Sequence, residues 1–491
     1  MTATLLARES ELLAGLPRGL WIGGSWREST GDVRLVVDDP ATGRPLADVA
    51  DADPVDAMAA LDAACRAQDE WAATSPRSRG EILRRAFDAV TARADDLALL
   101  ITMEMGKPLA EARAEVRYGA EFLRWFSEEA VRVHGRYAVA PDGGSRHLTL
   151  RRAVGPCLLI TPWNFPLAMA TRKIGPAIAA GCTMVLKPAA PTPLTSLALA
   201  EILHGAGLPC GVLNVVTTSR SAATTEPLLA DPRLRKLSFT GSTSVGQALI
   251  ARSAEQVLRV SMELGGNAPF LVFADADLDA AVEGALTAKM RNMGEACTAA
   301  NRFLVHADVA AEFTARLADS MQAMRVGRGT DPQVQVGPMI DERARSAVTD
   351  LVADAVTRGA TVVTGAEALP GPGSFYRPTV LTDVPPDSRL LHEEIFGPVA
   401  PVTTFTADEE ALTSANASPY GLAAYAYTRD AERALRIAEH LDVGMLGLNQ
   451  GLVSDPAAPF GGVKASGFGR EGGAEGIEEY LRTTYVGIPS R

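Results

Sequence analysis

The sequence predicts an α/β protein made of two doubly wound parallel sheets. From Ala153 onward, short apolar runs alternate with helical stretches, and the same rhythm begins again after Asn267. Each connection has room for one helix, which is typical of the βαβ units of a parallel sheet. The chain has 491 residues, more than the roughly 250–300 at which a single core stops growing. We therefore expect two α/β units rather than one.

Residues 1–50 are rich in Gly, Pro and Asp and predict loops and short strands. Asp53 and Pro54 then predict a helix N-cap followed by proline at the first helical position. Segments rich in Ala, Leu and Arg predict long amphipathic helices to about Arg132. The first α/β unit is expected to contain strands 154–160, 183–187, 212–216 and 235–240, with helices 167–180, 193–205, 222–230 and 243–253. The second is expected to contain strands 270–273, 302–306, 360–363 and 399–404, with helices that include 278–291 and 308–324.

Composition excludes several classes of partner. The chain has 47 basic and 59 acidic residues and a net charge of -12, and no basic stripe is present, so we expect no nucleic acid and no anionic membrane as partner. Arg8 and Glu9 are charged residues at positions where an export signal needs an apolar core, so we expect no export signal. The uncharged run 153–171 contains three prolines, which makes a membrane span improbable.

The five cysteines are odd in number and form no CxxC pair, and the six histidines form no pair at helical spacing. We therefore expect no disulfide framework, no metal site and a reducing, cytoplasmic compartment. The cysteines are Cys65, Cys157, Cys182, Cys210 and Cys297.

Two glycine-rich segments are candidates for phosphate binding. The GxGxxG at 467–472 follows a loop and leaves too little chain for a βαβ unit, so we interpret it as a false match. The segment 239–246 follows an expected strand and opens a helix, with Gly241, Ser242 and Gly246 placed to let backbone N–H groups reach a pyrophosphate. A plain strand-to-helix turn is an equally good interpretation of these residues. Lys187, at a strand end, is either a ligand of cofactor oxygens or a solvated lysine.

Two residues are candidates for covalent chemistry. Cys297 follows Gly294 and is flanked by small residues, as a presented thiolate would be. Glu263 precedes Gly265 and Gly266, which let a carboxylate approach a site closely. Taken alone, an inert buried cysteine and a surface carboxylate at a strand end are the more common alternatives.

Seven segments in order resemble the aldehyde dehydrogenase superfamily over nearly the whole chain, and together they favour the catalytic interpretation. They are Thr161-Pro-Trp163-Asn164-Phe-Pro166, Lys187-Pro-Ala, Phe239-Thr-Gly241-Ser242-Thr, Glu263-Leu264-Gly-Gly-Asn267, Gly294-Glu-Ala-Cys297, Glu393-Glu394-Ile-Phe396-Gly-Pro398 and Pro459-Phe-Gly-Gly-Val-Lys464-Ala-Ser466-Gly467.

The resemblance implies NAD(P)-dependent oxidation of an aldehyde to a carboxylic acid. Cys297 would add to the aldehyde carbon and form a thiohemiacetal, then a thioacyl-enzyme. The Asn164 side chain and the Cys297 N–H would hold the oxyanion, and Glu263 would activate the hydrolytic water. Residues implied to bind the cofactor are Trp163, Lys187, Ala190, Gly241, Ser242, Gly246, Leu264, Glu394 and Phe396. A non-catalytic protein on the same scaffold, and a hydrolase that uses the thiolate without cofactor, are the alternatives from other classes.

Within the superfamily, the sequence is most similar to succinate-semialdehyde dehydrogenases. The resemblance implies that Arg172, Arg291 and Ser454 hold the remote carboxylate, and an arginine fork suits a carboxylate well. The alternatives are that the arginines pair with nearby acids, and that the substrate is another aliphatic or ω-carboxy aldehyde. The sequence departs from the usual pattern at Glu295-Ala296, in place of Gln-Thr, and at Ala299, where many relatives have a second cysteine.

Cofactor preference and assembly are also implied by the resemblance. NAD-preferring relatives often have glutamate at the position of Ala190, which repels a 2′-phosphate, so we expect NADP to be favoured over NAD. Residues 1–130 and 152–262 would form the dinucleotide-binding domain, and 263–466 the catalytic domain. Residues 131–151 and 467–491 would form a protruding β element that joins subunits into a homodimer or homotetramer.

Overall fold

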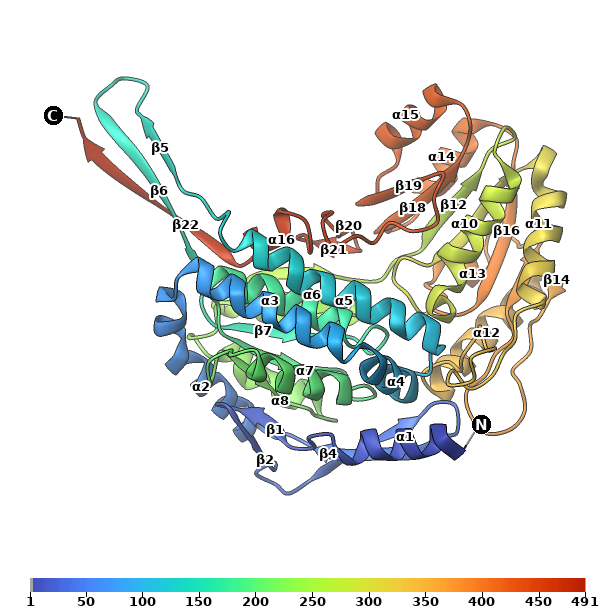
Figure 1. Ribbon diagram of the computed structural model, residues 1–491. Helices are drawn as coiled ribbons and strands as arrows, with labels where there is room; N and C mark the ends of the chain where they lie inside the picture. Colours follow the sequence, from blue (N-terminus) through green and yellow to red (C-terminus); the bar gives the residue numbers. More distant parts are fainter. Residues whose placement is uncertain (1–2, 491) are drawn as a thin grey trace.

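The computed structural model describes residues 3–490, which form two sheet-centred lobes and a projecting arm (Figure 1). The first lobe contains an eight-stranded sheet in the order β2-β1-β9-β8-β7-β10-β11-β21. Its five middle strands, from β9 to β11, pair in parallel, and the strands outside them pair antiparallel. The strands are β1 (Leu20–Ile22), β2 (Ser25–Arg27), β7 (Cys157–Ile160), β8 (Met184–Lys187), β9 (Leu213–Val215), β10 (Lys236–Thr240), β11 (Arg259–Glu263) and β21 (Gly467–Phe468).

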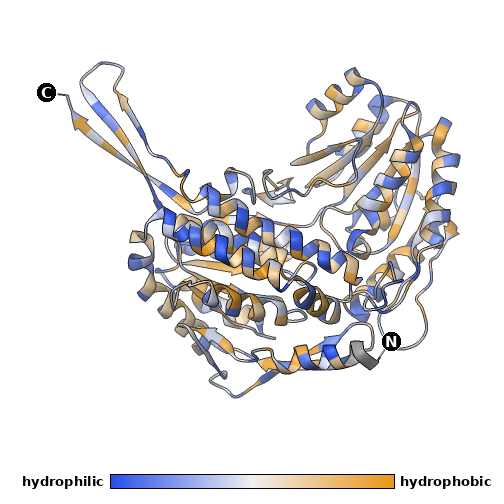
Figure 2. Cartoon of the chain, in the orientation of Figure 1, coloured by the Kyte–Doolittle hydropathy of each residue, from blue (hydrophilic) through white to orange (hydrophobic). Residues whose placement is uncertain are grey.

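Helices cover the parallel strands of this sheet (Figure 1), and these strands and the inner faces of the helices are rich in apolar residues (Figure 2). The apolar side chains form the buried core between sheet and helices. Strands β7, β8 and β10 are buried along their whole length, as expected for a parallel sheet covered on both faces. The helices of this lobe are α1 (Ala3–Ala14), α2 (Pro54–Ala73), α3 (Pro76–Ala92), α4 (Ala94–Met105), α5 (Leu109–Glu129), α6 (Ala168–Ala180), α7 (Leu194–Gly205), α8 (Ser221–Ala230) and α9 (Thr243–Ser253).

The second lobe contains a seven-stranded sheet in the order β14-β15-β16-β13-β12-β18-β19. All neighbours pair in parallel except the edge strand β14. The strands are β12 (Ala268–Val272), β13 (Ala300–His306), β14 (Thr361–Thr364), β15 (Thr379–Thr382), β16 (Val399–Phe405), β18 (Ala423–Tyr427) and β19 (Met445–Leu448). The helices are α10 (Leu278–Met290), α11 (Ala307–Gln322), α12 (Glu342–Arg358), α13 (Arg389–His392), α14 (Asp408–Asn416) and α15 (Ala431–His440).

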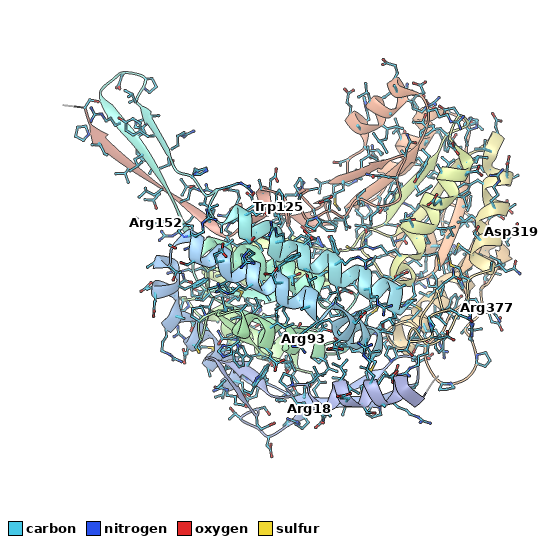
Figure 3. All side chains as sticks on the ribbon, viewed as in Figure 1. Arg18, Arg93, Trp125, Arg152, Asp319 and Arg377 are labelled. Atoms are coloured by element: carbon cyan, nitrogen blue, oxygen red, sulfur yellow. The ribbon has the colours of Figure 1, made fainter. Side chains whose placement is uncertain are left out.

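The arm is a three-stranded antiparallel sheet in the order β22-β6-β5, and it projects from the first lobe (Figure 1). Its strands are β5 (Arg136–Val139), β6 (Ser145–Ala153) and β22 (Leu481–Pro489). The C-terminal segment reaches β22 across the first lobe through β21 and the short helix α16 (Glu475–Glu478). Trp125 of α5 anchors this segment, since its indole N–H donates to the Gly473 carbonyl at 2.9 Å (Figure 3). Two further pairs, β3 (Arg34–Asp39) with β4 (Arg44–Ala50) and β17 (Tyr420–Gly421) with β20 (Val463–Lys464), complete the strands.

The predicted fold class is confirmed, with two parallel-sheet units that follow the predicted rhythm. The N-cap at Asp53 is confirmed as well, because its carboxylate accepts from the Val55 and Asp56 N–H groups and Pro54 is the first helical residue. The expectation of loops and short strands at the N-terminus was wrong for residues 3–14, which form α1. This helix packs against α4, and Arg8 pairs with Asp96 at 3.0 Å.

The GxGxxG at 467–472 has a structural use. Gly467 has φ +106°, and a Cβ there would lie 1.9 Å from the Met262 carbonyl oxygen, because β21 pairs closely with β11. Gly469 and Gly472 also have positive φ. Each conformation favours glycine on steric grounds alone. Among residues 3–490, no helix combines the length and apolar character that a membrane crossing requires.

Candidate active site

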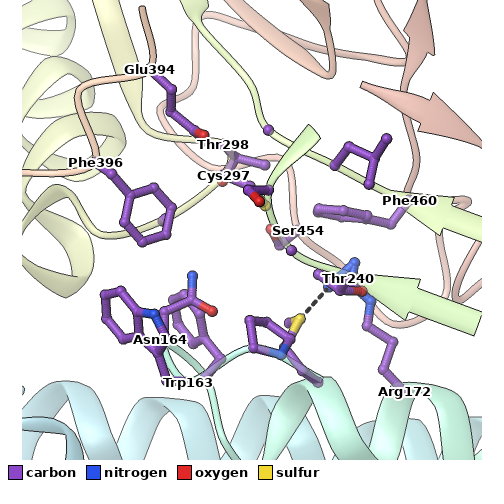
Figure 4. Close-up of a pocket in the computed structure, with 18 of the residues that line it drawn as sticks. Trp163, Asn164, Arg172, Thr240, Cys297, Thr298, Glu394, Phe396, Ser454 and Phe460 are labelled. Carbon is purple, nitrogen blue, oxygen red and sulfur yellow. Dashed lines mark hydrogen bonds between the residues drawn. The ribbon is translucent and has the colours of Figure 1, made fainter. Parts of the chain in front are cut away.

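A cavity of about 240 Å³ lies where the two lobes meet, at the carboxyl ends of the parallel strands of the first sheet (Figure 4). Both lobes contribute to its wall, as Figure 4 shows for Asn164 from one side and Cys297 from the other. Its lining residues are Tyr118, Pro162, Trp163, Asn164, Phe165, Met169, Arg172, Thr240, Gly241, Ser242, Leu264, Gly265, Arg291, Ala296, Cys297, Thr298, Glu394, Phe396, Ser454 and Phe460.

A strained turn presents Cys297 to this cavity. The turn precedes β13, and Asn292, Met293 and Gly294 all have positive φ there. A Cβ at Gly294 would lie 2.2 Å from the Gly397 carbonyl, so only glycine fits. Burial raises the pKa of the Cys297 thiol to about 12, although Arg172 acts in the opposite direction. The raised pKa favours the thiol form of Cys297, and a base must remove its proton before attack.

Asn164 is fixed beside the nucleophile. It is buried, and its Nδ2 donates to the Glu295 carbonyl at 2.9 Å. The backbone carbonyl of Asn164 accepts from Lys107 Nζ at 2.8 Å and from Asn292 Nδ2 at 3.2 Å. An amide nitrogen carries two hydrogens, so one Asn164 N–H remains to donate to an oxyanion.

Glu263 ends β11 as a buried carboxyl group behind the cavity wall. It is 2% exposed, and neither of its oxygens has a hydrogen-bond partner within the described part of the chain. Burial raises its pKa well above the usual range, and the charge of Glu471 adds to this effect. A carboxylate of high basicity is suited to proton removal near neutral pH.

A second wall of the cavity fits a dinucleotide. Ser242 is the N-cap of α9 but makes no side-chain cap hydrogen bond, so the N–H groups at this helix end stay open for a phosphate. The Thr240 hydroxyl is buried and has no hydrogen-bond partner among residues 3–490. A Cβ at Gly246 would lie 2.4 Å from Leu264, so the first turn of α9 packs closely against the Leu264 side chain.

Lys187 and Ala190 lie outside the cavity lining, and Lys187 contacts the start of α8. Lys187 ends β8 and is buried, and its Nζ donates to the Ser221 hydroxyl at 2.8 Å. Burial lowers the pKa of Lys187 to about 8, so an added anion would favour its charged form.

Glu394 and Phe396 lie together on the wall contributed by the second lobe. Glu394 accepts from the Gly266 N–H at 3.1 Å, and burial raises its pKa to about 7. Phe396 adopts φ +50° and packs edge-on against Trp163, with ring centroids 5.5 Å apart (Figure 4). A Cβ at Gly265 would lie 2.6 Å from the Glu394 carboxylate, so the glycine lets Glu394 reach the cavity.

Arg172, Arg291 and Ser454, which the resemblance implies as ligands of a remote carboxylate, all line the cavity. Arg172 is 1% exposed, its Nε lies 2.8 Å from Glu471 Oε2, and its guanidinium stacks on Phe460 at 3.7 Å. The alternative that this arginine pairs with an acid therefore holds in part. Its Nη1 donates to the Met169 sulfur at 3.6 Å (Figure 4), while Nη2 is buried and finds no hydrogen-bond partner in the described part of the chain.

Arg291 has no carboxylate partner within the described part of the chain, and it contacts two aromatic rings. Its guanidinium carbon lies 4.9 Å from the Phe165 ring centroid and 5.8 Å from that of Tyr118. These contacts are cation–π interactions, which leave the N–H edge free to donate.

Sequence reasoning missed several residues of this site. Glu471 lies within the GxGxxG that we set aside, and its carboxylate also binds Lys173 Nζ at 2.5 Å. Tyr118, Phe165, Met169 and Phe460 also line the cavity. Nothing in their local sequence distinguishes them from core residues, because α5, α6 and the C-terminal segment meet only in the folded chain.

Comparison with known proteins defines the class. The aldehyde dehydrogenase family model matches residues 26–486, and this chain belongs to that family. The family and its match over nearly the whole chain establish NAD(P)-dependent oxidation of an aldehyde as its activity. Among the described residues, no group of His, Cys, Asp and Glu is arranged to hold a metal ion.

Particular relatives are close. A succinate-semialdehyde dehydrogenase of Paenarthrobacter nicotinovorans is 64% identical over 443 residues, which is 90% of this chain and 98% of that protein. An NADP(+) succinate-semialdehyde dehydrogenase of Escherichia coli (strain K12) is 47% identical, over 95% of this chain and 97% of that protein. A crystal structure of an NADP-dependent enzyme from E. coli superposes with a TM-score of 0.96 at 46% identity, covering 98% of this chain and 99% of that one.

Proposed function

We propose that this chain oxidises an aldehyde that carries a carboxylate at its other end, and that succinate semialdehyde is the preferred substrate. The observation that carries the proposal is the placement of Arg172, Arg291 and Ser454 on the cavity that Cys297 also lines. Two guanidinium groups and a hydroxyl match the acceptors of a carboxylate. The names of the two relatives described above support the same substrate.

Cys297, Asn164 and Glu263 are proposed to perform the chemistry. Cys297 Sγ forms a bond to the aldehyde carbon, and the carbonyl oxygen becomes an oxyanion that accepts from Asn164 Nδ2 and the Cys297 N–H. Glu263 takes the thiol proton and releases it to solvent, and the regenerated carboxylate then takes the proton of the water that hydrolyses the thioester. Bound NAD(P) supplies the hydride acceptor for the oxidation. Its proposed contacts are Trp163, Lys187, Ala190, Gly241, Ser242, Gly246, Leu264, Glu394 and Phe396.

NADP is proposed to be favoured over NAD. Ala190 offers no carboxylate that would repel a 2′-phosphate, and Lys187 with Ser221 offers an ammonium and a hydroxyl at the start of α8. The charge of Lys187 is then stabilised by the phosphate that it binds.

A longer ω-carboxy aldehyde is the second candidate. Glutarate-semialdehyde dehydrogenases of two Pseudomonas species are 46% and 45% identical to this chain. The substrate assay separates the candidates: the protein is mixed with NADP and either succinate semialdehyde, glutarate semialdehyde or butanal, and the absorbance of the reduced cofactor is followed. We expect the highest kcat/KM for succinate semialdehyde. A higher value for butanal would contradict carboxylate recognition.

We also propose the assembly and compartment expected from the sequence. Domains 1–130 with 152–262, and 263–466, are proposed to bind cofactor and to carry the nucleophile, and the arm is proposed to join subunits. The arm exposes apolar side chains, namely Tyr137, Val139, Tyr485 and Ile488, which favours a homodimer or homotetramer. Light scattering with size-exclusion chromatography measures the mass. A reducing compartment such as the cytoplasm would keep the Cys297 thiol active.

A further inference from the structure

Tyr118 places a hydroxyl at the carboxylate-binding end of the cavity, and this hydroxyl has no partner. Tyr118 lies on α5 and lines the same cavity as Arg172 and Arg291. Its oxygen is buried, yet it makes no hydrogen bond to any of the described residues. A buried hydroxyl without a partner is costly, so such a group at the wall of a binding cavity points to a ligand that supplies the partner.

The surroundings of Tyr118 fix its ring against the two arginines. Its ring packs edge-on against Phe122, with centroids 5.0 Å apart, and the Arg172 guanidinium carbon lies 5.7 Å from the same Phe122 ring. Arg291 approaches the Tyr118 ring itself at 5.8 Å. Helix α5 can come this close because Gly119 faces α6, where a Cβ would lie 3.2 Å from the Ala168 Cα.

Two unpartnered donors therefore lie at one end of the cavity, Arg172 Nη2 and the Tyr118 hydroxyl. A carboxylate has two oxygens and about four lone-pair positions, so it can accept from both of them at once. An aldehyde without a carboxylate leaves both donors unsatisfied. Of the other unpartnered polar atoms of the site, Asn164 Oδ1 and the Glu263 oxygens are acceptors, Arg172 Nε faces Glu471, and the Thr240 hydroxyl lies on the wall formed with Gly241 and Ser242.

We propose that Tyr118 is a substrate-specificity residue, whose hydroxyl donates to the remote carboxylate of the substrate beside Arg172. This inference rests on the proposed function and adds a contact that neither the motif pattern nor the arginines reveal. The bond is charge-assisted, since a neutral donor meets an ionised acceptor, and such bonds exceed neutral ones in strength. It contributes only when the substrate carries the carboxylate.

The test compares Tyr118→Phe with the wild-type enzyme on succinate semialdehyde and on butanal, which has the same number of carbons and no carboxylate. The measured quantity is the ratio of kcat/KM for the two aldehydes. We expect Tyr118→Phe to lower this ratio about tenfold, the size of one hydrogen bond to a charged group. The matched control is Tyr376→Phe, which removes the hydroxyl of another buried tyrosine in the separate cluster around β15, and we expect it to leave the ratio unchanged.

A second measurement is independent of turnover. Succinate, the product, is titrated in the presence of NADP by calorimetry, and we expect its dissociation constant to rise about tenfold in Tyr118→Phe. Tyr118→Met, which has no hydroxyl, provides the same comparison if the phenylalanine variant does not fold.

Each result separates the two proposals. An unchanged ratio and unchanged succinate affinity in Tyr118→Phe would overturn the role of Tyr118, and so would equal losses on both aldehydes, which indicate a structural role. A wild-type enzyme that prefers butanal would instead overturn carboxylate recognition itself, whatever the variant does.

Discussion

Replacement of Arg172 by alanine tests the carboxylate-binding end of the cavity most directly. The guanidinium forms an ion pair with Glu471 through Nε and donates to the Met169 sulfur through Nη1, and Nη2 is buried without a hydrogen-bond partner among the described residues. A substrate carboxylate therefore gains a charge-assisted hydrogen bond from Nη2, together with the attraction of the whole guanidinium charge. Arg172→Ala removes both contributions.

The expected magnitude follows from the burial of this group. A hydrogen bond to a charged partner contributes about 1.5–3 kcal/mol, and loss of one member of a buried charge pair costs about 2–5 kcal/mol. The two ranges overlap between about 2 and 3 kcal/mol, which corresponds to a loss of kcat/KM for succinate semialdehyde of roughly thirtyfold to 150-fold. Glu471 keeps a cation after the substitution, since Lys173 Nζ lies 2.5 Å away, so we expect the fold to persist.

Butanal is the internal control for this substitution. It has no carboxylate, so we expect its kcat/KM to fall much less than that of succinate semialdehyde. The assay follows cofactor reduction with both aldehydes, and a thermal melt of each variant checks the fold. The double variant Arg172→Ala, Arg291→Ala extends the test to both arginines. If the ratio of kcat/KM for succinate semialdehyde to that for butanal is the same in the double variant as in the wild type, the arginines do not recognise the carboxylate.

Further predictions concern the cofactor, the base and the fold. Ala190→Glu is expected to shift the kcat/KM ratio of NADP over NAD at least tenfold toward NAD, because a carboxylate repels the 2′-phosphate; no shift would show that Ala190 lies away from it. Glu263→Gln is expected to give a burst of reduced cofactor followed by turnover at least a hundredfold slower, and stopped-flow absorbance detects the burst; unimpaired turnover would exclude Glu263 as the base. In the wild type the pH profile of kcat should fall on the acid side well above the usual carboxyl range, because burial raises the Glu263 pKa and protonation removes the base; a rate that is flat down to pH ~5 would contradict this. Gly467→Ala is expected to destabilise the fold by about 2–4 kcal/mol, since φ is +106° and the new Cβ would meet Met262, and a melting temperature equal to wild type would refute the structural role of this glycine.

The sequence was informative where local pattern and tertiary environment agree. Strands β7, β8 and β10 are buried on both faces and are apolar without interruption, so the sequence alone locates them. Strand β14 was expected at the right place, but its antiparallel pairing with β15 was not, because residue pattern does not encode strand direction. Helix α1 was missed because its place is set by contacts with α4.

The candidate site shows the same division. Cys297 and Asn164 lie within ordered motifs, and Arg172 and Arg291 lie a few residues outside two of them, so a resemblance could identify all four. Glu471 could not be identified, although it contacts Arg172 and Lys173. Its neighbours match a phosphate-binding pattern in letters only, and the contact joins residues about 300 positions apart along the chain. Contacts of this separation depend on how α6 and the C-terminal segment pack, which no local pattern specifies.

The ion pairs around Arg172 explain how a buried arginine can be ready for a substrate. An isolated buried charge is too costly to maintain, and Glu471 provides the counter-charge of Arg172. Lys173 binds the same carboxylate, so two cations face one anion and an excess positive charge remains. Lys173 and Arg172 hold the pKa of Glu471 below its usual value, which keeps this balance in place at neutral pH. A substrate carboxylate neutralises the excess, whereas butanal buries it further without compensation. Discrimination between the two aldehydes therefore arises as much from the penalty on the uncharged substrate as from the bonds to the charged one.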